Sequence, residues 1–239
     1  MKVIFVGPSL PDAASLSASG IVVRPPARQG DILRAVLDGA SVVGLIDGSF
    51  EYTAPVWHKE ILYGLTEGVS IFGSSSMGAL RAAECQTFGM IGIGEVHRRY
   101  STAMMVDDSD VALIHAPAEL GFRALSIPMV NLVVTLEHLV AAGHVTMEQQ
   151  DELICIVRKI FYKERNWGSI ANAACLENPI YDADFFESFR AFYIDIKRAD
   201  ALALIRAVIH APDQRSGTRP SWVFRSTSMW KSMLSDAKR

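Results

Sequence analysis

Cysteine is scarce in this sequence, which has only Cys85, Cys155 and Cys175, spaced far apart along the chain. An odd number at such spacing matches neither a disulfide framework nor a paired zinc motif. We therefore expect a reducing compartment, and with it a cytoplasmic protein. The histidines show no ligand spacing either, so the sequence predicts no metal site.

The sequence also lacks any run of the ~20 apolar residues that a membrane-spanning helix needs, although half of its residues are hydrophobic. Its first apolar run, Val3 to Val6, is too short for a signal peptide and predicts a buried strand instead. The 23 basic and 26 acidic residues leave a formal net charge of −3. This balance argues against a nucleic-acid partner, and we expect no membrane partner.

Short β-branched runs alternate with helical spacing through the first hundred residues. This alternation predicts an α/β fold with a mainly parallel sheet and flanking helices. The expected strands are 3–6, 21–23, 41–46 and 69–72, and the expected helices between them are 31–37 and 55–65. The second half has helical spacing at 129–140 and 147–162. We therefore expect an α/β core over residues 1–127 and a helical cap or partner-binding region over 128–239, unless the two form one continuous domain.

The most informative segment is Gly73-Ser74-Ser75-Ser76-Met77-Gly78-Ala79-Leu80, which follows an expected buried strand and opens a helix. Small residues allow a sharp turn there, and free N–H groups at a helix start can bind an anion or an oxyanion. Ser76 resembles the serine of a nucleophile elbow, although Ser74 stands where that pattern has glycine. Three interpretations stay open: a serine-rich helix cap, an anion or phosphate site, and a nucleophile.

A second segment could supply a base. Asp47-Gly48 closes the third expected strand, and Pro55 suits the first turn of the next helix. His58 falls within the apolar stripe of that helix, so periodicity predicts it to be the more buried polar group, as a core histidine or as a base. Lys59 lies on the flank, where a lysine is usually solvated. It could act as a base only if burial or nearby charge lowered its pKa.

Two other groups of charged residues have simpler interpretations. Asp107, Asp108 and Asp110 could bind a divalent ion, but they lack the glycine and the distal glutamate of a calcium loop. We prefer a loop with a helix cap there. Arg81 and Glu84 have the spacing of a local ion pair on the helix after the serines.

Several of these residues resemble the signature of the TfuA-like proteins. The most specific blocks are Trp57-His58-Lys59-Glu60-Ile61-Leu62 and the run from Gly73 to Glu84. The resemblance covers about residues 1–130 and is loose beyond that. Other positions that fit are Gly7-Pro8-Ser9-Leu10, Asp47-Gly48, Phe88-Gly89-Met90, Gly94, Asp107-Asp108 and Val111-Ala112.

The resemblance implies a role beside YcaO enzymes, which use ATP to activate backbone amides and install thioamides in ribosomally made peptides. A TfuA-like partner is similar to a hydrolase that releases sulfide from the terminal thiocarboxylate of a ThiS-like, ubiquitin-like sulfur carrier protein. The implied partners are thus a YcaO-type enzyme, that carrier and a precursor peptide. The alternative is a non-catalytic adaptor that positions them, with the serines as an anion-binding cap.

The resemblance also implies a catalytic Ser–Lys pair that needs no metal and no organic cofactor. Carried onto this chain, the lysine is Lys59 and the nucleophile is Ser76, which directly precedes Met77-Gly78, with Ser75 as the alternative. The substrate-binding residues that the resemblance implies are Asp47, Gly48, His58, Gly73, Met77, Gly78, Arg81 and Glu84.

Overall fold

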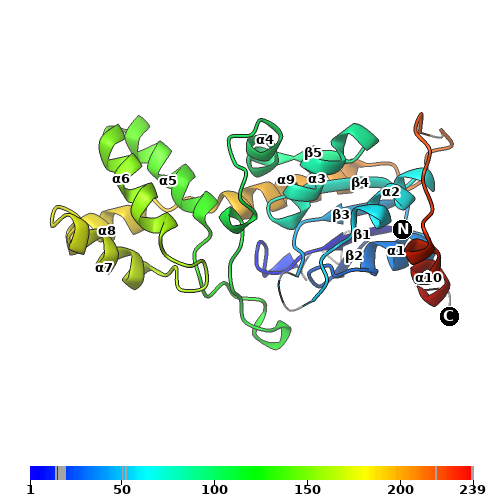
Figure 1. The fold of residues 1–239 in the computed structure, drawn as a ribbon, viewed down its shortest axis with the longest axis horizontal. Coiled ribbons are helices and arrows are strands. Elements are labelled where there is room, and N and C mark those ends of the chain that lie inside the picture. The colour runs from blue at the N-terminus through cyan, green and yellow to red at the C-terminus, as the bar shows by residue number, and fades with distance from the viewer. Residues whose placement is uncertain (14, 16–19, 50, 52, 219, 238–239) are drawn as a thin grey trace. The chain divides into compact units, whose positions relative to one another are not determined.

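The computed structural model describes residues 1–13, 15, 20–49, 51, 53–218 and 220–237, and it contains a five-stranded parallel sheet (Figure 1). The strands are β1 Lys2–Phe5, β2 Ile21–Arg24, β3 Val42–Leu45, β4 Ser70–Ser74 and β5 Ile91–Ile93. The four expected strands are confirmed, and the short run at 91–93, which ends at Gly94, adds the fifth. Their order in the sheet is β2-β1-β3-β4-β5.

This strand order indicates at which edge of the sheet a ligand is expected to bind. In an open parallel sheet, ligands bind beyond the carboxyl ends of the strands, where the strand order reverses. Here the reversal lies between β1 and β3, which pair in parallel with Lys2 opposite Val42. The segments that leave this edge next to each other are Gly7–Leu10, Asp47–Gly48 and the serine turn after β4.

Helices cover both faces of the sheet. The side chains of successive strand residues point to opposite faces. Val3 and Phe5 therefore pack with one helical layer, whereas Ile4 and Val6 pack against α9 on the other face. The helices of this part are α1 Asp31–Leu37, α2 His58–Thr66, α3 Met77–Cys85, α4 Gly94–Ser101, α9 Ile196–His210 and α10 Ser228–Ala237. The layer formed by α1, α2 and α3 shares its apolar core with Val3 and Phe5.

Residues 107–196 form a separate compact unit with its own apolar core. Its helices are α5 Met129–Ala141, α6 Met147–Arg158, α7 Trp167–Glu177 and α8 Ala183–Ala191. The other unit joins residues 1–106 to 197–239. The expected boundary between residues 127 and 128 does not coincide with this division, because the second unit already begins at residue 107. The region expected as one helical cap is itself divided, since α9 packs on one face of the sheet and so belongs to the first unit. No helix in the described ranges is both long and apolar enough to cross a bilayer.

After α9, the C-terminal segment runs past the amino ends of the strands. The Arg215 Nε donates to the Ala40 carbonyl just before β3 at 2.9 Å, and the Ser216 N–H donates to the Gly68 carbonyl just before β4 at 2.7 Å. Trp230 of α10 is then buried against the rings of Trp57 and Tyr63. The C-terminal segment is therefore an integral part of the α/β unit.

Candidate functional site

The serine turn between β4 and α3 is tightly constrained by its backbone. Ser75 has a φ of 67°, in the left-handed region that a non-glycine residue seldom adopts. The Ser76 N–H donates to the Ser74 carbonyl at 2.7 Å, which closes the turn. A Cβ atom on Gly78 would lie 1.8 Å from the Leu45 carbonyl oxygen. A glycine at this position thus lets α3 start directly against the end of β3.

All three serine side chains of the turn contact the first turn of α9. The Ser74 hydroxyl donates to the Asp200 carbonyl at 3.0 Å, and the Ser75 hydroxyl donates to the Lys197 carbonyl at 2.8 Å. The Ser76 hydroxyl instead accepts a hydrogen bond from the Lys197 amine, with Nζ and Oγ 3.2 Å apart. Ser74 and Ser75 therefore anchor the helix backbone, while Ser76 pairs with the lysine.

Both members of this pair are buried. Lys197 is 2% exposed and Ser76 is 4% exposed, a rare environment for a lysine. The interpretation of Ser76 as a plain helix cap receives no support, because its side chain makes no capping hydrogen bond to α3. The structure thus brings together a serine at a strand-to-helix turn and a buried amine within hydrogen-bond reach.

Lys59, the lysine that the resemblance implies, has other partners. Its amine donates to the Arg225 carbonyl and lies 5.2 Å from the centre of the Phe224 ring. Both partners belong to the C-terminal segment, so the described contacts of Lys59 attach that segment to α2. The lysine that contacts Ser76 is Lys197, which the sequence analysis did not nominate.

Lys197 does leave a signal in the sequence. It lies in phase with the apolar stripe of α9 formed by Ala201, Leu204, Ile205 and Val208. A lysine on the apolar face of a helix is expected to be buried, and a buried lysine needs a specific partner. That observation alone would have nominated Lys197, although not its contact with Ser76.

Asp47 joins the ends of β1 and β3 beside the serine turn. Its Oδ2 accepts from the N–H groups of Gly7 at 2.8 Å and Ser9 at 3.0 Å, and its Oδ1 accepts from the Ser9 hydroxyl at 2.7 Å. Next to it, a Cβ on Gly48 would lie 2.2 Å from the Met77 sulfur. The expected residues Asp47, Gly48 and Met77 therefore lie together, with the Asp47 carboxylate shaping the loop after β1.

His58, Arg81 and Glu84 form a separate cluster that links α2 to α3. The Glu84 carboxylate lies 2.8 Å from His58 Nε2 and 2.6 Å from Arg81 Nη1, so the expected Arg81–Glu84 pair is confirmed. Burial would raise the pKa of Glu84, but the hydrogen bonds from His58 and Arg81 outweigh it and lower that pKa. His58 and Arg81 also line a cavity of about 350 Å³ near Trp57.

The buried polar residue of α2 is Glu60, not His58. Glu60 is fully buried, whereas the His58 side chain is 43% exposed. The two Glu60 carboxylate oxygens accept from the Leu33 N–H at 3.2 Å and from the Trp57 N–H at 3.1 Å. This contact sets the start of α2 at His58, so Pro55 lies before the helix and not in its first turn. Burial raises the pKa of Glu60.

The acidic run at 107–110 has the predicted capping role. The Asp107 carboxylate accepts from the Ser109 N–H at 2.8 Å, which lowers the pKa of Asp107. Asp110 is buried and forms an ion pair with Arg158 at 2.9 Å. Within the described ranges, no three acidic, histidine or cysteine side chains are grouped so that they could hold a metal ion.

Comparison with known proteins adds one match. A family model described as TfuA-like protein matches residues 47–166. No curated protein matches the chain. The matched range contains the serine turn and Lys59 but ends before Lys197, which explains why the family resemblance alone could not point to α9.

Proposed function

The chain belongs to the TfuA-like protein family, and from this premise we propose that it is a Ser–Lys hydrolase that releases sulfide from a thiocarboxylated sulfur carrier. Ser76 is the nucleophile and Lys197 is the base, in place of Lys59. The observation that carries the proposal is the 3.2 Å hydrogen bond between the Lys197 amine and the Ser76 hydroxyl. A nucleophile and its base must lie within this kind of reach.

The environment suits this chemistry. Lysine acts as a base when burial or neighbouring charge favours its neutral form, and Lys197 is 2% exposed. The hydroxyls of Ser74 and Ser75 donate to the backbone carbonyls of Asp200 and Lys197, not to the amine. Of the three serines, Ser76 is thus the one whose oxygen lies within reach of the Lys197 Nζ.

The reaction proceeds in two halves. Neutral Lys197 takes the proton of the Ser76 hydroxyl, and the serine oxygen attacks the thiocarboxylate carbon. The C–S bond then breaks, sulfide leaves with the proton that Lys197 returns, and an acyl-serine remains. Water, deprotonated by Lys197, hydrolyses the acyl-serine to the carrier carboxylate. Overall, one thiocarboxylate and one water give one carboxylate and one hydrogen sulfide.

The start of α3 provides a donor for the tetrahedral intermediate. Met77 is the first residue of α3, and Ser76 is its N-cap. The first N–H groups of a helix have no intrahelical acceptor and can stabilise an oxyanion. The Met77 N–H therefore suits the oxyanion that forms when Ser76 attacks.

The released sulfide would serve a YcaO-type enzyme that installs a thioamide in a precursor peptide. The test uses purified protein and a ThiS-like carrier with a C-terminal thiocarboxylate, alone and with the YcaO-type enzyme, and measures free sulfide. Ser76→Ala and Lys197→Met should each lower the rate by about a thousandfold or more, with folding checked by circular dichroism. If Ser76→Ala, Ser75→Ala and the lysine variants all keep the wild-type rate, the hydrolase proposal fails and the adaptor function replaces it.

A further inference from the structure

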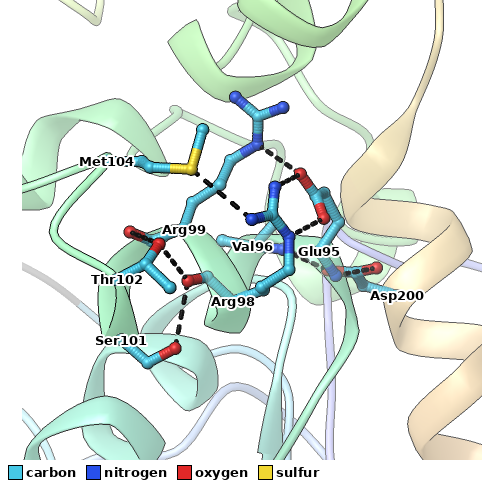
Figure 2. Close-up of polar contacts among 8 residues, drawn as sticks. All are labelled: Glu95, Val96, Arg98, Arg99, Ser101, Thr102, Met104 and Asp200. Atoms are coloured by element: carbon cyan, nitrogen blue, oxygen red, sulfur yellow. Dashed lines mark hydrogen bonds and ion pairs between the residues drawn. The ribbon is translucent and has the colours of Figure 1, made fainter.

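Asp200 lies one helical turn after Lys197 on α9 and holds the start of α4. Its Oδ1 accepts from the Glu95 N–H at 3.0 Å and its Oδ2 accepts from the Val96 N–H at 2.8 Å. Figure 2 shows this carboxylate at the first turn of α4. Both oxygens are therefore occupied by backbone donors of a helix that belongs to the same unit.

The fit around this carboxylate is close. Gly94, the first residue of α4, has a φ of +94°, and a Cβ on it would lie 2.2 Å from the Asp200 Cγ. Asp200 itself is 4% exposed. A glycine at this position lets the carboxylate approach the helix start closely, and any larger residue would displace it.

The same turn of α9 is held from a second side. The Ser74 hydroxyl donates to the Asp200 carbonyl, and the Ser75 hydroxyl donates to the Lys197 carbonyl. The backbone that carries the Lys197 amine is thus fixed between the serine turn and α4. The carboxylate of Asp200 provides the contact with α4.

We propose that Asp200 is a positioning residue for the Ser76–Lys197 pair, because its carboxylate fixes the first turn of α9 against α4 and so keeps the Lys197 amine at Ser76. This inference rests on the proposed function. It assigns Asp200 no contact with the substrate. Asp200 acts only by fixing the position of the Lys197 side chain and limiting its mobility.

The charged groups around Asp200 make this contact sensitive to pH. The pKa of Asp200 is raised to about 6, mainly because the carboxyl is buried. The Glu95 charge also raises this pKa, whereas the hydrogen bonds from the Val96 and Glu95 N–H groups and the charge of Arg99 lower it. Glu95 is itself paired with Arg98 at 2.6 Å and Arg99 at 2.8 Å (Figure 2). The two charges that act on Asp200, Glu95 and Arg99, thus both come from α4.

Protonation of Asp200 weakens its contact with α4. A protonated carboxyl has no negative charge and carries a donor on one oxygen, so it accepts the two N–H groups more weakly. The folded-state pKa of about 6 lies above the ordinary value of 3.8. This group therefore stabilises the fold most below pH 3.8, and that contribution is lost as the pH rises through 6. Acidification below 6 thus weakens the contact between Asp200 and α4, although the protonation of Asp200 does not itself lower the free energy of unfolding.

The test compares Asp200→Asn with wild type for kcat, KM and pH dependence of sulfide release. The variant should lower kcat by about tenfold and leave KM within about twofold, because positioning acts on the chemical step. Protonation of Asp200 below pH 6 should likewise lower kcat by up to about tenfold, and Asp200→Asn should remove this part of the pH dependence. Wild-type kcat and pH dependence in Asp200→Asn would overturn the proposal.

The matched control is Asp12→Asn. Asp12 forms an exposed ion pair with Arg198, which lies next to Lys197 on α9. The Arg198 Nη1 lies 2.6 Å from the Asp12 Oδ1, and the Arg198 Nη2 lies 2.8 Å from the Asp12 Oδ2. An exposed pair contributes about 0–1 kcal/mol, so this variant should keep the wild-type kcat and pH dependence. If Asp200→Asn does not fold, full kcat in Asp200→Glu would overturn the proposal, because the longer side chain displaces the carboxylate.

A readout that needs no catalysis separates this inference from the proposed function. Brief treatment with an amine-acylating reagent, followed by mass spectrometry, measures the access to Lys197. Labelling of Lys197 should rise by about tenfold in Asp200→Asn and stay at the wild-type level in Asp12→Asn. If wild type releases no sulfide, the proposed function fails while this labelling result still decides the positioning role. Unchanged labelling of Lys197 in Asp200→Asn would overturn the positioning role of Asp200.

Discussion

The Ser75 hydroxyl donates to the carbonyl of Lys197, 2.8 Å away and 122 residues later in the chain. The amine of that same lysine lies 3.2 Å from the neighbouring serine, Ser76. Adjacent serines thus hold the two ends of one residue, its backbone and its side chain. This arrangement separates the anchoring serine, Ser75, from the serine that we propose as the nucleophile, Ser76.

The first prediction separates the two lysines. Lys59→Met should keep sulfide release near the wild-type rate, because the Lys59 amine contacts Arg225 and Phe224 of the C-terminal segment. It should cost about 0.5–1 kcal/mol of stability and increase protease cleavage of the C-terminal segment. Lys197→Met should show the reverse, with catalysis lost. An inactive Lys59→Met beside an active Lys197→Met would return the role of base to Lys59.

The second prediction concerns Ser75. Ser75→Ala and Ser75→Gly both remove the hydroxyl that anchors Lys197, and loss of about 1 kcal/mol should slow catalysis about fivefold. Because Ser75 has a φ of 67°, the glycine variant should be the more stable of the two by about 1 kcal/mol. Chemical denaturation and sulfide release provide both readouts. Complete loss of activity in both variants, with Ser76→Ala active, would make Ser75 the nucleophile.

The third prediction concerns Glu60 and stability. Glu60→Ala leaves the buried N–H groups of Leu33 and Trp57 without their acceptor. This should lower the free energy of unfolding by about 2–4 kcal/mol, measured in urea. Glu119→Ala, at an exposed position, serves as the control and should change it by less than about 0.5 kcal/mol.

The pH dependence of the Glu60 effect has a defined sign. Burial raises the folded-state pKa of Glu60 above its ordinary value of 4.5. The stability linked to this group is therefore fully present below 4.5 and is lost as the pH rises through the folded-state pKa. As the pH rises from 4.5 through the folded-state pKa of Glu60, the free energy of unfolding of the wild type should therefore fall relative to that of Glu60→Gln. A constant difference across the same pH range would contradict this account.

The fourth prediction concerns the entry into α3. Gly78→Ala places a Cβ 1.8 Å from the Leu45 carbonyl oxygen, so β3 and α3 must separate and the melting temperature should fall by about 10 °C or more. Gly217→Ala is the matched control, because a Cβ at Gly217 meets no atom within 4 Å. A melting temperature of Gly78→Ala equal to that of the control would show that the turn can relax.

The sequence patterns predicted the sheet well because its strands are short apolar runs separated by helical spacing, and the three central strands β1, β3 and β4 are buried on both faces. The start of α2 was predicted less well, since Pro55 suited a first helical turn while the buried Glu60 carboxylate places that start at His58. His58 lay in phase with the apolar stripe, yet it is Glu60 that is fully buried. A single long-range acceptor, shared between α1 and α2, overrode the local periodicity.

By itself, the sequence determined the α/β class, the serine turn after a buried strand and the family. These follow from local patterns: alternation, glycine and serine at a strand-to-helix turn, and a contiguous block of matching residues. Only the tertiary structure decided which lysine meets Ser76. Lys197 lies 121 residues from Ser76 in the chain and outside the matched range. The packing of the apolar stripe of α9 against the sheet brings the two together, and spacing along the chain carries no information about such a contact.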